Sequence, residues 1–358
     1  MGAEIAQVIT YSGLPVVVKD IDQGQLDLAR TTVEGINQRR VDKGKMTAAQ
    51  MQEKLDLIEY TLDYEEFADV DIVIEAVPEV MKIKQQVYKE LDAACPPDTI
   101  FASNTSALSI TEMGSATNRP HRMIGMHFFS PAHIMKLVEI IPSPETEQDA
   151  VDTVEQFTQE LRKIPVIVKE CPGFLVNRLL LPYLNEAAMA LEQGAATAEE
   201  IDGAMGRGGF GWPMGPFFLM DMIGIDVCYH TGENILPYDP KPYPEPKLFT
   251  KLMEAERYGE KAGVGFYTYT KTDAEPLETI IQQLQESGEV ETGTRFSVDR
   301  LMMPFFNEAA RCVAEEIANV NDIDMACIAG IGMQVNKDGE IVRMGPLEYM
   351  DEVGLDVI

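Results

Sequence analysis

The chain has 358 residues, of which 45% are hydrophobic and 25% are charged, a globular composition that excludes general disorder. With 29 Lys and Arg against 59 Asp and Glu, the net charge is −30, so we expect no binding to nucleic acid or to an anionic membrane surface. No apolar run has the roughly 18 residues of a membrane span, and the first residues lack the basic start of a secretory signal.

The cysteines of the chain are scattered and form no recognisable pattern. They include neither a C-x-x-C pair nor a zinc-ligand spacing, so we expect no disulfide framework and no metal site. Such cysteine usage indicates a reducing compartment. We expect the cytoplasm of a bacterium or archaeon, or the peroxisome or mitochondrial matrix of a eukaryote.

Strand and helix patterns alternate along the first 170 residues. Helical patterns at 23–40 and 79–93 lie between short β-branched runs. We expect these runs to be strands, at 15–18, 70–74, 99–102, 123–126 and 164–168. The alternation predicts an α/β fold with a Rossmann-like, doubly wound parallel sheet.

The first twenty residues match the later part of a dinucleotide-binding unit. Such a unit opens with a strand, a G-x-G-x-x-G turn and a helix, and an acidic residue after its second strand binds the ribose hydroxyls. Here Gly2 would be the last glycine, a helix would span 3–12, and the next strand ends at Asp20. Asp20 would favour NAD over NADP, because its carboxylate repels a 2′-phosphate. The alternative is a surface Asp that follows a strand.

The opening strand of that unit does not precede Gly2. We expect its absence to leave a gap beside the second and fourth strands, with unpaired backbone groups and exposed apolar side chains. The turn would also supply N–H groups for the pyrophosphate. We therefore predict that this chain binds NAD weakly or not at all, and that an added strand with glycines restores binding.

An internal repeat follows the α/β part. Segment 174–188 recurs at 296–310, an offset of 122 residues, with nine of fifteen positions identical. The dipeptide Ile-Asp at 201–202 returns at the same offset, whereas Gly-Pro at 215–216 returns at an offset of 130, so the second copy has gained eight residues near VNKDGEIV. Apolar residues at helical spacing predict that both copies are helical.

These patterns predict four parts of the chain, with the first boundary near CPG at 171–173. We expect an α/β domain over 1–170, a helical domain over 171–270, a polar linker with one short helix over 271–294, and a second, incomplete helical copy over 295–358.

Several later motifs, in their order and spacing, resemble the L-3-hydroxyacyl-CoA dehydrogenase family of fatty-acid β-oxidation. They are SNTS at 103–106, HFFSP at 127–131 with Glu139 twelve residues after His127, PGFLVNR at 172–178, GWPMGP at 211–216 and GEKAGVGFY at 259–267. The duplicated helical part and the HFFSPAH wording resemble the multifunctional enzymes of the family. The resemblance implies NAD-dependent oxidation of (S)-3-hydroxyacyl-CoA to 3-oxoacyl-CoA. It also implies a fused or associated enoyl-CoA hydratase and thiolase, and a homo-oligomer.

His127 is the candidate general base. Oxidation of a 3-hydroxyl needs a group that takes the O–H proton, and an unperturbed imidazole titrates near neutrality. Glu139 lies in an apolar run, where a carboxylate must face solvent or have a partner. The resemblance assigns the catalytic His–Glu pair to these two residues. The alternatives are a core histidine satisfied by backbone groups and His133 as the base.

The remaining site residues follow from the resemblance. Ser106 and Asn177 would bond the substrate in a cleft between the domains, although Ser106 could instead cap a helix. Because Asp299 replaces Asn177 in the second copy, we expect that copy to be a scaffold. The expected NAD contacts, besides Gly2, Asp20 and Ser106, are Glu79, Lys84, Ser130 and Lys261. Lys43 and Lys45, with Arg39 and Arg40, form the basic cluster where we expect the CoA phosphates.

Two other functions stay open on the residues alone. Another two-domain 3-hydroxy-acid dehydrogenase would use a lysine base, and a large separation of His127 from Glu139 would favour it. A chain without its phosphate turn could instead be a non-catalytic scaffold.

Overall fold

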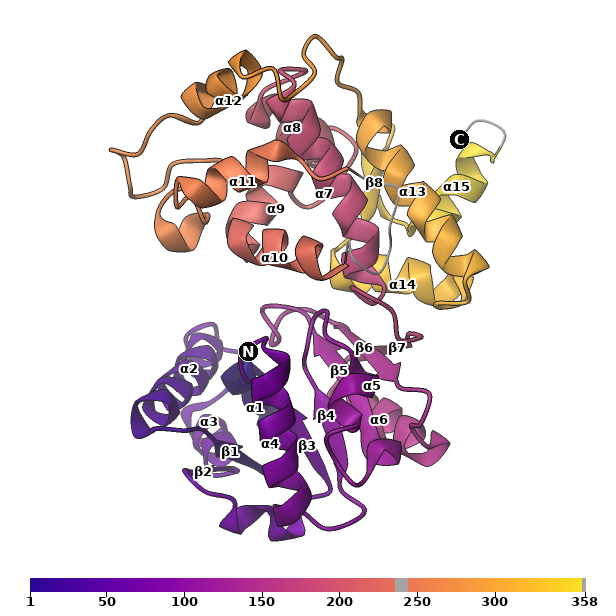
Figure 1. The fold of residues 1–358 in the computed structure, drawn as a ribbon. Coiled ribbons are helices and arrows are strands. Elements are labelled where there is room, and N and C mark those ends of the chain that lie inside the picture. The colour runs from indigo at the N-terminus through magenta and orange to yellow at the C-terminus, as the bar shows by residue number, and fades with distance from the viewer. Residues whose placement is uncertain (236–243, 356–358) are drawn as a thin grey trace. The chain divides into compact units, whose positions relative to one another are not determined.

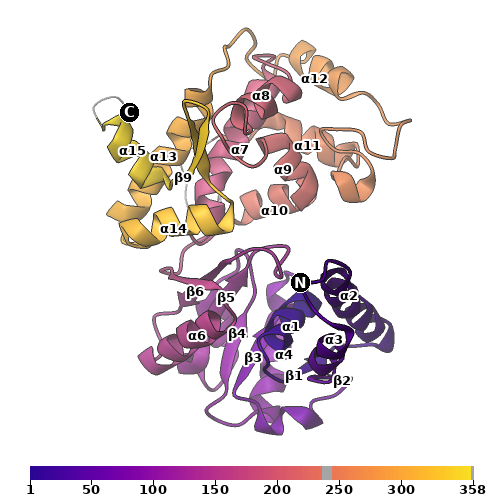
Figure 2. The same cartoon turned by 180° about the vertical axis from the view of Figure 1, so that it is seen from behind.

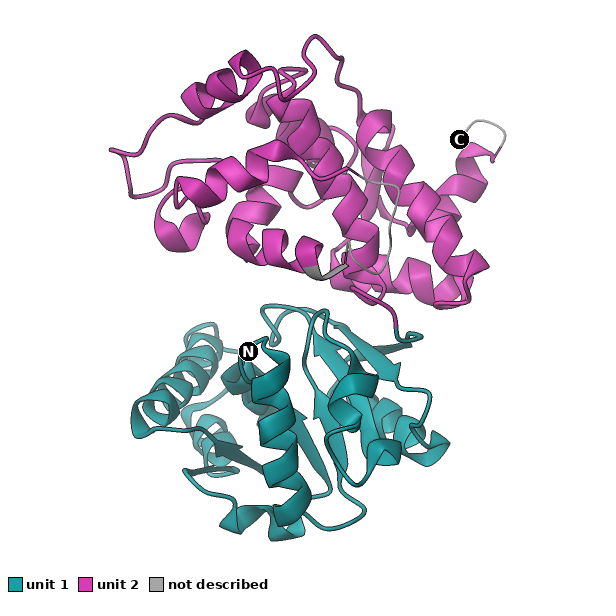
Figure 3. Ribbon diagram, viewed as in Figure 1, with its two compact units in different colours: residues 1–170 teal, residues 171–358 magenta. Residues whose placement is uncertain are grey.

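The computed structural model describes residues 1–235 and 244–355. The chain divides into two compact units, Met1–Glu170 (unit 1) and Cys171–Ile358 (unit 2), which Figure 3 shows in different colours. None of the helices in the described ranges combines the length and the apolar character that a membrane span requires.

Unit 1 is an α/β unit in which helices alternate with strands (Figure 1). Its longer helices are α1 (Gly2–Tyr11), α2 (Gln23–Asp42), α3 (Ala48–Leu55), α4 (Met81–Ala94), α5 (Ile110–Gly114) and α6 (Gln148–Glu160). Its strands are β1 (Val16–Lys19), β2 (Ile58–Thr61), β3 (Ile72–Glu75), β4 (Ile100–Ser103), β5 (Met123–Phe128), β6 (Leu137–Pro142) and β7 (Ile164–Ile167). Short 3-10 turns lie at Glu65–Asp69 and Pro120–Arg122.

The strands of unit 1 form two separate sheets. Five strands lie in the order β3-β4-β5-β6-β7, and β1 and β2 form a parallel pair of their own. The gap expected beside the second and fourth strands is therefore present, between β1 and β3, and Figures 1 and 2 show the β1–β2 pair apart from the larger sheet. The expected Rossmann-like parallel sheet is confirmed, with one exception: β5 and β6 pair antiparallel. A short connection permits this pairing, whereas parallel neighbours need a long crossover.

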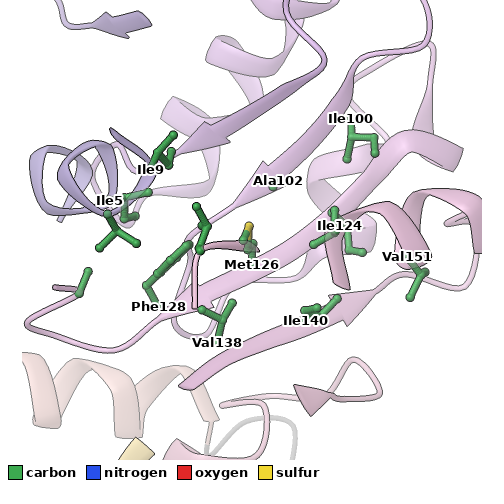
Figure 4. Close-up of a cluster of buried hydrophobic side chains, with 14 of the residues drawn as sticks. Ile5, Ile9, Ile100, Ala102, Ile124, Met126, Phe128, Val138, Ile140 and Val151 are labelled. Carbon is green, nitrogen blue, oxygen red and sulfur yellow. The ribbon is translucent and has the colours of Figure 1, made fainter. Parts of the chain in front are cut away.

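One face of the five-stranded sheet is covered by α1 and α6. Ile5 and Ile9 of α1 and Val151 of α6 pack with Ile124 and Met126 of β5 in a buried cluster (Figure 4). The spacing of Ile5 and Ile9 places both on one side of α1, which is why this helix lies on the sheet. Burying each such side chain contributes about 1.5–3 kcal/mol.

The other face carries α4 and α5. Tyr88 of α4 lies beside Phe101 of β4, with ring centroids 5.8 Å apart. Gly125 of β5 lets α5 approach closely, because an added Cβ would lie 3.0 Å from Ile110 Cδ1. Successive side chains of a strand alternate between faces, so His127, two residues after Gly125, lies on this face too.

Unit 2 consists of helices with one short hairpin (Figure 1). The helices are α7 (Val176–Glu192), α8 (Ala198–Met205), α9 (Pro216–Ile223), α10 (Ile225–Ile235), α11 (Lys247–Glu254), α12 (Leu277–Glu286), α13 (Val298–Ala314), α14 (Val320–Gly330) and α15 (Pro346–Val353), with a 3-10 turn at Glu260–Ala262. The second copy was expected to be all-helical, but it contains β8 (Gln334–Lys337) paired with β9 (Glu340–Arg343). Asp338 and Gly339 join them with positive φ angles of 52° and 93°, as a tight hairpin turn requires.

The two repeat copies bond to each other reciprocally. Arg178 of α7 pairs with Glu308 of α13 at 2.6 Å, and Arg300 of α13 pairs with Glu186 of α7 at 2.5 Å. Each partner in one pair is the repeat equivalent of a partner in the other, at the offset of 122 residues. The copies therefore pack about an approximate two-fold axis, in the manner of a symmetric dimer interface.

Candidate active site

His127 and Glu139 are brought together by the register of β5 and β6. They are directly opposite each other in this antiparallel pair, and opposite residues point to the same face of a sheet. His127 Nδ1 lies 2.7 Å from Glu139 Oε2. A large distance between His127 and Glu139 would have favoured a dehydrogenase with a lysine base, but the two side chains are in contact.

Burial strengthens the interaction between His127 and Glu139. Glu139 is fully buried and His127 is 5% exposed, and the ring of Phe129 lies 4.6 Å from the imidazole. A buried carboxylate without a partner is costly, and Nδ1 supplies one. With Nδ1 held at the carboxylate, the ring is oriented and its charged form is stabilised, as the Asp of a catalytic triad does for its histidine.

The loop after β4 is tied to the strand that carries His127. Asn104 Oδ1 accepts a hydrogen bond from the Phe128 N–H at 2.8 Å. Sequence reasoning gave Asn104 no role, although it lies within the SNTS motif. This bond fixes the start of the loop that contains Ser106 relative to the end of β5.

Glu79 holds the same loop from the other side. Its Oε1 accepts hydrogen bonds from Thr105 Oγ1 at 2.5 Å and from the Ser106 N–H at 2.9 Å. Its side chain is 38% exposed, so it can still meet a ligand. The capping role considered for Ser106 was wrong: α5 starts later, and Ser109 caps it by accepting from the Glu112 N–H.

Lys84, an expected NAD contact, is buried in this structure. Its side chain is 1% exposed. Its ammonium donates to Glu75 Oε1 at 2.8 Å and lies 3.3 Å from Glu79 Oε2. These ion pairs hold Lys84 beside the carboxyl end of β3, and its contact with NAD stays a prediction. The side chain of Lys84 turns inward because Glu75, at the end of β3, offers a buried negative charge.

Glu75 is a residue that sequence reasoning missed. The signal was an acidic residue at the end of the apolar strand VDIVIEA, where a carboxylate needs a partner. Glu75 also accepts hydrogen bonds from Ser103 Oγ at 2.7 Å and from Tyr88 Oη at 3.3 Å. It therefore joins the carboxyl ends of β3 and β4, where nucleotides bind in such sheets.

The residues at the end of β1 fit a dinucleotide. Asp20 follows β1, and its Oδ1 accepts from the Ile21 N–H at 2.7 Å. The Lys19 ammonium lies over the ring of Tyr64, 4.3 Å from its centroid, and not beside Asp20. The start of α1 carries no side-chain cap, so its N–H groups can meet an anion. Met1, Gly2 and Asp20 line one cavity.

Close packing does not require a glycine at position 2. It is the first residue of α1, and an added Cβ would lie 3.7 Å from Ala76 Cβ, which is an ordinary contact. The expected role of Gly2 as a glycine of the phosphate turn therefore rests on its position and not on crowding.

The expected CoA-binding cations lie at and after the end of α2. Arg39, Lys43 and Lys45 are exposed. Arg40 instead lies over the ring of Tyr11, 4.2 Å from its centroid, where its charge is partly engaged.

His133, the alternative base, has a different environment from His127. Its Nδ1 lies 3.8 Å from Glu4 Oε2, while Glu4 accepts a hydrogen bond from the Ala132 N–H at 2.6 Å. Burial lowers the pKa of His133. Ser130, in the same loop, is exposed.

The expected site residues beyond 170 belong to unit 2. Asn177 lies in the first turn of α7. Lys261 is exposed and forms an ion pair with Asp226 at 2.6 Å. Among the residues that the structure describes, no group of His, Cys, Asp or Glu is arranged to hold a metal ion.

Both halves of the chain match profiles of one family. Residues 1–171 match the profile described as 3-hydroxyacyl-CoA dehydrogenase, NAD binding domain, and residues 173–269 and 296–358 match the C-terminal domain of the same enzymes. The chain belongs to the 3-hydroxyacyl-CoA dehydrogenase family. The expected family and the expected NAD cofactor are thereby confirmed.

Curated relatives are longer than this chain. The chain is 39% identical over 367 residues to a fatty acid oxidation complex subunit alpha of Psychrobacter sp. (strain PRwf-1), and 40% identical to that of Acinetobacter baylyi. Each match covers 99% of this chain and 50% of the relative. The chain thus spans about half the length of the curated relatives it matches.

Solved structures of this family have the same fold. The chain is similar to 3-hydroxybutyryl-CoA dehydrogenase from Escherichia coli K12, with a TM-score of 0.86 and 26% identity over 99% of this chain and 90% of that one. It is also similar to (S)-3-hydroxybutyryl-CoA dehydrogenase from Ralstonia eutropha, with a TM-score of 0.72 and 38% identity over 75% of this chain and 95% of that one.

Proposed function

We propose that this chain oxidises (S)-3-hydroxyacyl-CoA to 3-oxoacyl-CoA with His127 as the general base. The observation that carries the proposal is the buried His127–Glu139 pair, with Nδ1 and Oε2 2.7 Å apart, at the end of a sheet in an NAD-binding domain. The imidazole of His127 is the partner that the buried carboxylate of Glu139 requires.

The chemistry of the base follows from this geometry. When bound, NAD accepts the hydride that leaves C3 of the substrate. His127 takes the proton of the 3-hydroxyl at Nε2, since Nδ1 is engaged with Glu139. The carboxylate of Glu139 then stabilises the imidazolium, so that deprotonation of the substrate hydroxyl does not leave His127 as an isolated buried cation.

The ligand contacts form two groups in this proposal. Asp20 accepts from the ribose hydroxyls of NAD, and the N-terminal N–H groups of α1 meet its phosphates. The other proposed NAD contacts are Gly2, Glu79, Ser106, Ser130 and Lys261. Ser106 and Asn177 bond the substrate oxygens, and Lys43 and Lys45, with Arg39, meet the phosphates of CoA.

The setting of the reaction is part of the proposal. The curated relatives are bacterial subunits of fatty acid oxidation complexes. We propose that this chain likewise works within a multienzyme complex in a bacterial cytoplasm, where an associated hydratase supplies the 3-hydroxyacyl-CoA and a thiolase consumes the product. We propose a homo-oligomer as its state.

The test is NADH formation by the chain with (S)-3-hydroxybutyryl-CoA, followed by absorbance over a range of NAD concentrations. The matched control is free (S)-3-hydroxybutyrate, which lacks the CoA that the basic residues would bind. Turnover with the thioester and not with the free acid supports the proposal. Equal turnover of both would remove CoA from it. Because the sequence predicts weak NAD binding without a strand and glycine turn before Gly2, a chain extended by such a segment is assayed in parallel, and no turnover by either protein at saturating NAD would favour a non-catalytic scaffold.

A further inference from the structure

The loop between β5 and β6 is held at one residue by two side chains of opposite charge. Glu4 Oε2 accepts a hydrogen bond from the Ala132 N–H at 2.6 Å. The Lys163 ammonium donates to the Ala132 carbonyl and, at 2.6 Å, to the Met135 carbonyl. Ala132 is 1% exposed and belongs to the buried cluster that α1 covers. We call Glu4 and Lys163 the Ala132 clamp.

The two members of the clamp come from elements that are far apart in the chain. Glu4 lies in the first turn of α1. Lys163 directly precedes β7 and follows the end of α6. Arg162 has a positive φ of 59°, and the Lys163 N–H bonds to the Thr158 carbonyl at 3.1 Å, as in a Schellman helix end. The fixed end of α6 therefore sets the direction in which Lys163 leaves the helix.

The burial of Lys163 indicates that the loop must keep one position. The residue is 8% exposed, and burial lowers its pKa to about 8. Enclosing an ammonium is costly unless its protons find acceptors, and the carbonyls of Ala132 and Met135 supply them. A surface loop can leave such carbonyls to water. A buried cation that bonds both of them restrains the loop more than water would.

The restrained loop lies beside the residues proposed to bind NAD. It carries Ser130, which is exposed and follows His127 by three residues. Glu4 lines the same cavity as Gly2 and Asp20. The clamp thus ties the loop after the catalytic strand to the start of α1, where we propose that the phosphates of NAD bind.

The clamp also offsets a charge that would oppose the cofactor. A free carboxylate in the first turn of α1 would repel the phosphates of NAD. The Ala132 N–H bonds this carboxylate, and Lys163 is close enough for its pKa to respond to the charge of Glu4. His133 Nδ1 also lies 3.8 Å from Glu4 Oε2, but burial lowers the pKa of His133 and disfavours its cation.

We propose that Glu4 and Lys163 are positioning residues for NAD, which hold Ala132 between opposite charges and so fix Ser130 relative to the start of α1. Both act through Ala132 and neither touches the reacting atoms. The inference rests on the part of the proposed function that places NAD at Ser130 and α1. It does not depend on which hydroxyacyl substrate is oxidised.

The test measures NAD binding by calorimetry, on the chain and on the N-terminally extended protein in parallel. We expect Lys163→Met and Glu4→Ala each to raise the Kd for NAD by about tenfold or more, because a loop that is not held must be ordered when the cofactor binds. Combining the two should cost little more than either alone, since both act through Ala132.

Two further variants separate positioning from a loss of charge. Glu4→Gln keeps an acceptor for the Ala132 N–H and should bind NAD within about threefold of the wild type. Lys136→Met is the matched control, because it removes an exposed cation from the same loop. An effect of Lys136→Met equal to that of Lys163→Met would overturn the proposal, because any lost cation would then weaken binding.

Hydrogen exchange and urea unfolding distinguish positioning from a purely structural role. We expect the Ala132 amide to exchange about tenfold faster or more in Glu4→Ala while the protein stays folded. Faster exchange and lower stability with an unchanged Kd for NAD would make the clamp merely structural and would overturn the proposal, as would a wild type that binds no NAD in either protein. Weaker NAD binding in the two clamp variants supports it, even where the wild type fails to oxidise the thioester and the proposed reaction fails.

Discussion

Lys84 and Glu75 form an ion pair that solvent hardly reaches: Nζ lies 2.8 Å from Oε1, and each side chain is 1% exposed. The same carboxylate accepts from Ser103, from Tyr88 and from the Val77 N–H. Burial raises the pKa of Tyr88 well above its usual range, so its hydroxyl stays a donor. The pair therefore anchors the strand ends from which the Ser106 loop departs.

We predict that Lys84→Met destabilises the protein by about 3–5 kcal/mol, because it leaves the buried charge of Glu75 without a partner. Urea unfolding measures the change. The double variant Lys84→Met, Glu75→Gln should recover part of the loss, since no buried charge is left. A loss below about 1 kcal/mol with a large drop in NAD affinity would instead show that Lys84 acts mainly at the cofactor site.

We predict that His127→Gln lowers kcat by about 10²–10⁴ without loss of fold, the usual range for removal of a general base. The glutamine amide can still donate to Glu139, so the buried carboxylate keeps a partner. Circular dichroism checks the fold and NADH formation checks the rate. His133→Gln is the matched control, and activity retained in His127→Gln but lost in His133→Gln would reverse the assignment.

We predict that Asp20→Ala weakens the preference for NAD over NADP, because a carboxylate at the ribose repels a 2′-phosphate. The measurement is the ratio of kcat/KM for the two cofactors in a protein extended at its N-terminus by a strand and a glycine turn, because weak NAD binding is expected without them. Asp22→Ala is a control on the same turn, where the carboxylate caps α2 by accepting from the Gln25 N–H. If both variants leave the ratio unchanged, Asp20 does not lie at the ribose.

The pairing of His127 with Glu139 was accessible to sequence reasoning. Both are polar residues inside apolar runs that a short loop connects, and a buried carboxylate needs a partner. The doubly wound unit and the helical repeat were accessible for a similar reason, because hydrophobic period and self-similarity are local properties of the sequence.

Other features depend on tertiary contacts that no local pattern encodes. Lys84 lies on an amphipathic helix, where a lysine is usually solvated, and only the position of Glu75 draws it inside. Strand β2 has the sequence IEYT, which mixes apolar and polar residues without a clear strand pattern. It forms by pairing with β1. The antiparallel direction of β6 follows from the path of the chain and not from its composition.

The repeat dipeptide Ile-Asp is explained by helix capping in both copies. Asp202 accepts from the Phe217 and Phe218 N–H groups at the start of α9. Asp324 does the same for Leu347 and Glu348 at the start of α15. The repeated glycine before each helix allows this approach, since a Cβ on Gly215 would lie 2.3 Å from Asp202 Cα.

This cap predicts a pH dependence of stability. Asp202 is 5% exposed, and burial raises its pKa from 3.8 to about 6. A carboxyl whose pKa is higher in the folded state binds its proton more tightly there. Its contribution to stability is therefore full below about pH 4 and is lost as the pH rises through about 6. Over that interval the loss amounts to about 3 kcal/mol.

The measurement compares the wild type with Asp202→Asn, which cannot titrate at this position. We expect the free energy of unfolding of the wild type, minus that of the variant, to fall by about 3 kcal/mol from pH 4 to pH 7. Charges elsewhere in this acidic chain affect both proteins alike and cancel in the difference. Asp324→Asn should show a change of the same sign, because burial also raises the pKa of Asp324. Tyr267 Oη also donates to Asp202 Oδ2, at 2.7 Å. A difference that stays flat or rises with pH in Asp202→Asn would show that the hydrogen bonds from α9 and Tyr267 outweigh the burial of the charge.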